Sequence, residues 1–261
     1  MKFIIDEVSR TTFAHTLLER RNSEINTTVR RIHVLNDVIQ AVKDIYYHPN
    51  TLWAHARDGR AVHKPTSVEP FNSKVEVLLN NIGELIYDYF NNEGNTTNNQ
   101  INFDKFHEIL CDKFLKGINT IRATAGLSDM SYGQAQKLIN LTFKYLTTYD
   151  DYLDFADLFS YCHMVIDSIV LSNLGRNRIG MILGVRPVKG ISNLKGSQFK
   201  GKGWTSFTKE DYLSLVHEYR TMIAPYIGDN TYMQIEYHMW PTYSPISSTG
   251  TYAKPINKFY K

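Results

Sequence analysis

The sequence predicts a mostly α-helical protein, a compact globular arrangement of six to eight helices with a glycine- and lysine-rich loop region. Apolar residues recur at steps of three and four along several stretches, which is the period of an amphipathic helix. The alternating patterns typical of strands are sparse. With 261 residues, 43% of them apolar, the chain can enclose a substantial hydrophobic core. We therefore expect one domain over 1–261, with a possible sub-domain break in the Asn-rich connection at 91–102.

The longest apolar stripe covers 25–45 and predicts one long helix that ends near His48-Pro49. The same periodicity predicts further helices over 75–90, 103–114, 131–146, 149–160, 166–174 and from Thr208 to about 223. Prolines and polar residues over 48–73, and glycines over 175–203, predict loops. The aromatic tail after Met233 is interpreted as packing that covers the core.

Two helix starts carry specific signals. Ser131 or Tyr132 is expected to begin the helix over 131–146. Thr208 with Asp211 resembles a capping box, with Asp in place of the usual Glu or Gln.

The two cysteines, Cys111 and Cys162, are too few for a disulfide framework or a four-thiolate metal site, and both lie in apolar runs. They are expected to be buried free thiols. The N-terminus becomes acidic too early for a signal peptide, and no apolar run approaches about 20 residues. We therefore expect a cytoplasmic protein with no membrane partner. We also expect no cofactor and no metal, although His48, His55 and His63 share one loop.

The net charge of +3 is divided unevenly along the chain. Residues 1–167 carry 17 basic and 21 acidic side chains, whereas 168–261 carry 12 basic and 5 acidic ones. No acidic residue lies between Ser168 and Lys209, where seven glycines accompany the cations Arg176, Arg178, Arg186, Lys189, Lys195, Lys200, Lys202 and Lys209. We call this the basic stretch.

Glycine allows close approach of a backbone to phosphate, and Lys and Arg supply charge without reading sequence. Trp204 can stack on an unpaired base. The basic stretch is therefore interpreted as a nucleic-acid contact through Arg176, Arg178, Lys195, Lys200, Lys202 and Trp204. The alternative is a solvated loop that balances the acidic first part of the chain.

The helix that begins near Ser131 adds a second candidate contact. Gly133 near its N-terminus leaves backbone N–H groups for a phosphate, and the helix dipole favours an anion there. Gln134 carries an amide that suits a base or a phosphate. Lys137 follows one turn later, and Asp167 precedes another apolar helix. For Lys137 the alternative is an exposed helical lysine, and for Asp167 it is an N-cap.

Over residues 126–175 the sequence resembles the helix-hairpin-helix DNA glycosylase superfamily, in particular its 8-oxoguanine glycosylase-like branch. Gly133-x-Ala135-x-Lys137 is similar to the family's Gly-x-Gly-x-Lys hairpin, with Ala135 in place of the second glycine. Ile166-Asp167 is similar to the Val-Asp or Ile-Asp that starts the next helix. The resemblance implies that Lys137 is the nucleophile and Asp167 the catalytic carboxylate of a base-excision enzyme acting on DNA.

The sequence thus predicts a nucleic-acid-binding protein, most specifically a DNA glycosylase/lyase-like enzyme. Two alternatives stay open. One is a non-catalytic regulatory or interaction protein whose basic stretch meets an acidic protein. The other is a small-nucleotide binder that uses the same glycines.

Overall fold

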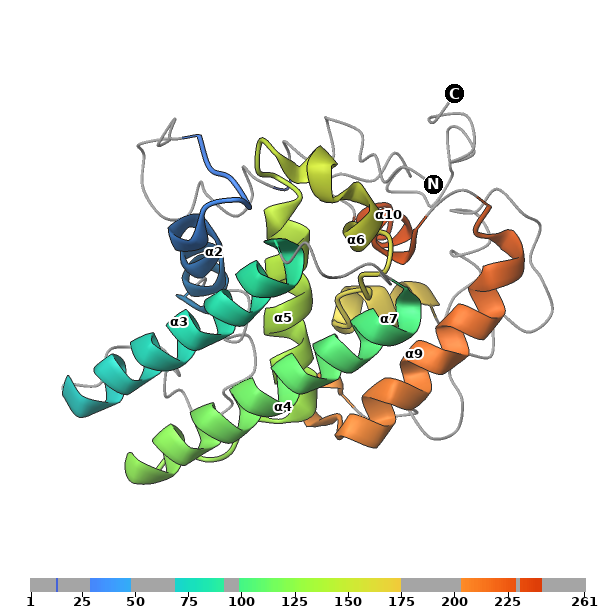
Figure 1. The fold of residues 1–261 in the computed structure, drawn as a ribbon. Helices are drawn as coiled ribbons and strands as arrows, with labels where there is room; N and C mark the ends of the chain where they lie inside the picture. The colour runs from blue at the N-terminus through green and yellow to red at the C-terminus, as the bar shows by residue number, and fades with distance from the viewer. Residues whose placement is uncertain are drawn as a thin grey trace.

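The computed structural model describes residues 13, 29–47, 69–91, 99–174, 203–228 and 231–240. Within these ranges it contains eight α-helices, three 3₁₀ helices and no strand, so the predicted mostly α-helical class is confirmed (Figure 1). The α-helices are α2 Leu35–Tyr47, α3 Glu69–Asn91, α4 Gln100–Thr124, α5 Tyr132–Leu146, α6 Ala156–Phe159, α7 Ser168–Leu174, α9 Lys209–Ile223 and α10 Tyr232–Tyr237. The 3₁₀ helices are η1 Tyr152–Phe155, η3 Trp204–Ser206 and η4 Ala224–Tyr226.

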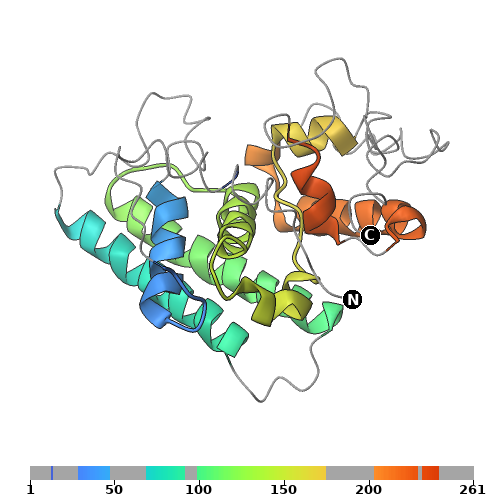
Figure 2. The same ribbon diagram turned by 90° about the horizontal axis from the view of Figure 1, so that it is seen from above.

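Helix α5 is the central element of the described part. It lies between α2, α3 and α4 on one side and α7, α9 and α10 on the other (Figures 1 and 2). Every residue of α5 except Gln134 is buried. A helix covered all round must satisfy its polar side chains internally, since water does not reach them. The candidate site is built from those buried polar side chains.

Both predicted helix starts are confirmed. Ser131 caps α5 and Thr208 caps α9, each in a complete capping box with the residue three positions later. A third capping box, Thr231 with Gln234, starts α10, which begins just before the tail that was interpreted only as core packing and continues into it. The Thr-x-x-Gln pattern in the sequence is the signal that would have indicated this helix.

The prediction of one long helix over 25–45 is wrong for residues 29–34, because α2 begins only at Leu35. The N–H groups of Ile32 and His33 donate instead to the Asp151 carboxylate at 2.8 and 3.1 Å. An acceptor from a distant segment thus replaces the helix carbonyls, so the apolar period continues while the helix does not.

Other boundaries also differ from expectation: α4 runs on to Thr124, past the expected end at 114, and α7 begins at Ser168 instead of 166. The loop expected over 48–73 gives way to α3 already at Glu69, because Pro70 sits in the first turn, where a missing N–H costs nothing. The single helix expected over 149–160 divides into η1 and α6. The N–H of Asp154 there donates to the Asp151 carbonyl at 3.0 Å, the tighter bond of a 3₁₀ turn.

The core joins buried apolar side chains from α2 through α10. Cys111 and Cys162 are free and buried in it, as predicted, and burial raises the pKa of both thiols. None of the described helices combines the length and apolar character needed to cross a membrane.

Candidate active site

Lys137 projects from α5 into a buried position beside Asp167. Its Nζ lies 4.0 Å from Asp167 Oδ2, and the two side chains are 8% and 4% exposed. The ring of Trp204 lies 4.6 Å from the same Nζ, which is within cation–π range. Burial lowers the pKa of Lys137, and the charges of Asp167 and Glu236 oppose that shift. The structure therefore brings together three of the residues predicted from the sequence, Lys137, Asp167 and Trp204.

Asp167 has two roles in the structure. Its Oδ1 accepts the N–H groups of Ile169 and Val170, both at 2.9 Å, and so caps α7. Its Oδ2 faces Lys137. Asp167 is therefore both the N-cap of α7 and a neighbour of Lys137. The exposed-lysine alternative for Lys137 is wrong, since the side chain is almost fully covered.

Gly133 and Gln134 serve the start of α5. The N–H of Gly133 donates to the Phe207 carbonyl at 3.1 Å, and a Cβ added at Gly133 would overlap the carbonyl oxygen of Trp204. The side chain of Gln134 accepts from Ser131 N at 3.0 Å as half of the capping box. In this structure the Gly133 N–H and the Gln134 side-chain oxygen are therefore both hydrogen-bonded within the protein.

The other candidate nucleic-acid contacts, Arg176, Arg178, Lys195, Lys200 and Lys202, lie outside the described residues, and their role stays a prediction. Trp204 is described and lies in η3, 4% exposed. The described ranges contain no group of three or more His, Cys, Asp or Glu side chains arranged to hold a metal ion.

Sequence reasoning missed a second buried ion pair on α5. Lys144 Nζ lies 2.7 Å from Glu236 Oε1 of α10, with both side chains 1% exposed. The rings of Phe13 and Tyr237 lie 4.9 and 4.1 Å from the same Nζ. Burial lowers the pKa of Lys144 and raises that of Glu236, and each charge moderates the other's shift. Lys144 lies seven positions after Lys137 and so on the same face of α5, but the sequence does not indicate its burial, because lysines are almost never fully buried unless paired.

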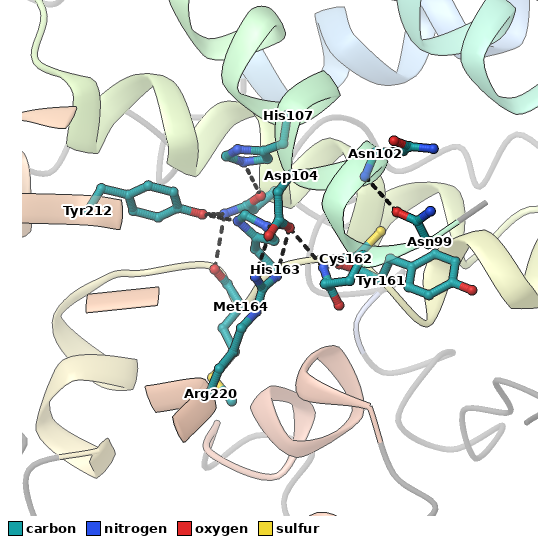
Figure 3. Close-up of polar contacts among 12 residues, drawn as sticks. Asn99, Asn102, Asp104, His107, Tyr161, Cys162, His163, Met164, Tyr212 and Arg220 are labelled. Carbon is teal, nitrogen blue, oxygen red and sulfur yellow. Dashed lines mark hydrogen bonds and ion pairs between the residues drawn. The ribbon is translucent and has the colours of Figure 1, made fainter. Parts of the chain in front are cut away.

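A polar network lies next to this site, between α4, α9 and the segment 162–167. Asp104 accepts two hydrogen bonds from Arg220, at 2.6 and 3.0 Å, and its Oδ1 lies 2.9 Å from His163 Nε2 (Figure 3). His163 Nδ1 lies 2.7 Å from the Tyr212 hydroxyl (Figure 3). Burial lowers the pKa of His163 to about 4, so at neutral pH its ring is neutral and Arg220 is the cation that faces Asp104. Arg220 and His163 hold the pKa of Asp104 well below its usual range, although burial raises it.

Comparison with protein-family models, curated proteins and solved structures gives no match to this chain.

Proposed function

We propose that the chain is a nucleic-acid-binding protein, most specifically a DNA glycosylase/lyase-like base-excision enzyme. Lys137 is its nucleophile and Asp167 its carboxylate. The observation that carries the proposal is the 4.0 Å approach of these two side chains, each less than one-tenth exposed. A buried lysine beside a single carboxylate is the arrangement that amine catalysis needs, because the amine must be partly neutral and its proton must have an acceptor.

The protonation state of Lys137 supports a nucleophilic role. Burial lowers its pKa below the ordinary 10.5, so a larger fraction of the amine is neutral near pH 7. Asp167 opposes the shift but remains the closest charged acceptor for the proton. A group of this kind differs from a surface lysine, which stays protonated and unreactive at neutral pH.

The reaction follows from this pair. The neutral amine of Lys137 attacks C1′ of a flipped-out nucleotide and forms an N–C1′ bond while the glycosidic bond breaks. The electron pair of the broken bond leaves with the base. The attacking nitrogen then gives up a proton, which Asp167 can relay to the departing base. Opening of the sugar ring yields a Schiff base, and elimination from it cleaves the strand. The Asp167 charge stabilises the cationic sugar during the first step.

Trp204 and the basic stretch supply the expected contacts to DNA. The Trp204 ring lies beside Lys137 Nζ, and turning it outward from its buried position would offer a face for an unpaired base. Cations of the basic stretch would contact phosphates, and binding should then weaken steeply as salt is raised.

Borohydride trapping on a duplex oligonucleotide with one abasic site tests the proposal. The Schiff base between Lys137 and the C1′ aldehyde would be reduced to a stable amine, giving a covalent protein–DNA adduct. We expect the adduct in wild type and its loss in Lys137→Gln. Asp167→Asn keeps an oxygen that can cap α7 but removes the charge, and should slow trapping by about 10²- to 10⁴-fold.

The matched control is Lys43→Gln, because Lys43 of α2 is a partly exposed lysine that is paired with Glu76 and lies outside the basic stretch. It should trap at the wild-type rate. No adduct in wild type, or an adduct that survives Lys137→Gln, contradicts the lyase assignment. Binding of an acidic protein alone, or a thermal shift with free nucleotides but not with DNA, would instead favour one of the two alternative functions.

A further inference from the structure

The segment 162–167 forms neither helix nor strand, and side chains bond to its backbone at Met164, Val165 and Ile166. The Met164 carbonyl accepts from Asn140 Nδ2 at 3.0 Å, and the Val165 N–H donates to Glu236 Oε2 at 2.9 Å. The Ile166 carbonyl and N–H are both bonded to the amide of Gln136, at 2.7 and 3.2 Å. Gln136 thus pairs with Ile166 as a neighbouring strand would, and we call these two bonds the Gln136 clamp.

Every hydrogen-bonding capacity of the Gln136 amide is used. Its Nε2 also donates to the Gly133 carbonyl at 2.8 Å, and its Oε1 also accepts from Asn140 Nδ2 at 3.0 Å. An amide has two donors and two acceptor sites, so this buried side chain is saturated and its orientation is fixed. No freedom remains for the amide to turn over without breaking bonds.

The clamp lies one residue from both members of the candidate site. Gln136 precedes Lys137, and Ile166 precedes Asp167. The 4.0 Å between Lys137 Nζ and Asp167 Oδ2 is longer than a hydrogen bond, so the pair does not fix its own separation. The positions of the two backbone segments that carry these side chains therefore help to set it.

We propose that Gln136 is a positioning residue that sets the separation of Lys137 and Asp167 by clamping the backbone of Ile166. This inference rests on the proposed function of the pair. It assigns to Gln136 no contact with DNA.

The polar network is hydrogen-bonded to the Gln136 clamp through Asn140. Asn140 Oδ1 lies 2.8 Å from His107 Nε2, and Asn140 Nδ2 also donates to the Tyr212 hydroxyl at 3.0 Å. Tyr212 bonds in turn to His163, which precedes the clamped residues in the same segment (Figure 3). The amide of Gln136 is therefore held by a network whose other end is the ion pair of Asp104 with Arg220.

The test compares two substitutions that differ in what they can donate. Gln136→Met removes both clamp bonds at similar volume. Gln136→Glu, when ionised, still accepts from Ile166 N but places an oxygen against the Ile166 carbonyl; when protonated, it restores a donor. Asn91→Leu is the matched control, since Asn91 Nδ2 also donates to a carbonyl of a distant segment, Ile32 O at 3.1 Å, and neither residue belongs to the segments that carry Lys137 and Asp167.

Trapping rates on the abasic-site duplex are measured from pH 5 to pH 9 for variants whose melting confirms folding. Because a misplacement of about 1 Å can cost 10²-fold, Gln136→Met should trap roughly 10- to 100-fold more slowly than wild type. The ratio of the Gln136→Glu rate to the wild-type rate should rise as pH falls, whereas the Gln136→Met ratio should not. Wild-type rates in both variants, or an equal loss in Asn91→Leu, would overturn the proposal.

A second readout does not depend on activity. Titration of the Lys137 amine by ¹⁵N NMR, assigned by its absence in Lys137→Gln, reports how close Asp167 lies. Gln136→Met should shift the Lys137 midpoint and Asn91→Leu should not. If wild type forms no adduct, the proposed function fails while this titration still decides the clamp. An unshifted midpoint in Gln136→Met then refutes it.

Discussion

At Gly133 a missing side chain decides how closely Trp204 approaches the first turn of α5. The Gly133 N–H is bonded to the Phe207 carbonyl, and the Trp204 carbonyl lies where a Cβ would stand. The 203–207 turn therefore rests directly on α5, and the Trp204 ring reaches Lys137 Nζ. A glycine needed for a ligand and one needed for a neighbouring backbone look alike in a sequence, because both follow from the absence of Cβ. That is why the sequence suggested a phosphate contact and did not indicate this packing.

Gly133→Ala should destabilise the protein by about 1–3 kcal/mol, the usual cost of overpacking a tight contact. It should also move Trp204, which intrinsic fluorescence during urea unfolding can follow. The control is Gly203→Ala, next to the same tryptophan, whose Cβ would meet only Thr205 Oγ1 at an ordinary 3.6 Å. Equal stability of the two alanine variants would show that the 203–207 turn yields easily and does not depend on Gly133.

Among the elements, α4 and α9 are joined to the segment 162–167 by groups that titrate. His163 is neutral in the fold because burial lowers its pKa from 6.5 to about 4, although Asp104 acts in the opposite sense. Burial also lowers the pKa of His107 well below its usual value. A pKa depressed in the fold means that the unfolded chain binds the proton more readily, so stability is complete above pH 6.5 and falls as the pH falls.

We therefore expect the free energy of unfolding to drop by about 3 kcal/mol between pH 6.5 and pH 4 from His163 alone, at about 1.4 kcal/mol per pH unit. His107 adds to this loss with the same sign. Urea unfolding at pH 7, 5.5 and 4 measures it. His163→Gln should lose less stability over this range than wild type, whereas His217→Gln, on the exposed side of α9, should follow wild type. A wild-type curve that is flat from pH 7 to pH 4 would show that the two rings carry protons in the fold.

Helix positions could be predicted where the cause is local. The caps of α5 and α9 depend on residues three positions apart, and the apolar period of α3, α4 and α5 was recognisable from the chain. The start of α2 could not be predicted, because its competing acceptor is Asp151, which is far away in sequence. The same limit applies to the clamp, because Gln136 and the Ile166 carbonyl to which it donates are 30 positions apart in the sequence.

For the molecule as a whole, charge was the least predictable feature. Lys137, Lys144 and Glu236 belong to residue types that are almost never fully buried unless paired, so a sequence alone places them at the surface. Instead α5 carries two buried lysines, each facing a carboxylate from the C-terminal half of the chain. Of the two carboxylates, Glu236 lies on α10 and Asp167 lies at the start of α7. Buried charges therefore connect α5 to both elements.

Substitutions in the Lys144–Glu236 pair test how strongly the buried ion pair between α5 and α10 contributes to stability. Lys144→Met leaves Glu236 buried without its cation and should cost about 3–5 kcal/mol. Adding Glu236→Gln removes the uncompensated charge, and its amide oxygen can still accept the Val165 N–H. The double variant should therefore lie within about 2 kcal/mol of wild type in urea unfolding followed by circular dichroism and fluorescence. Lys209→Met breaks exposed ion pairs only and should cost less than about 1 kcal/mol. A double variant no more stable than Lys144→Met alone would mean that lost packing around the Lys144 stem, and not the stranded charge, causes the loss.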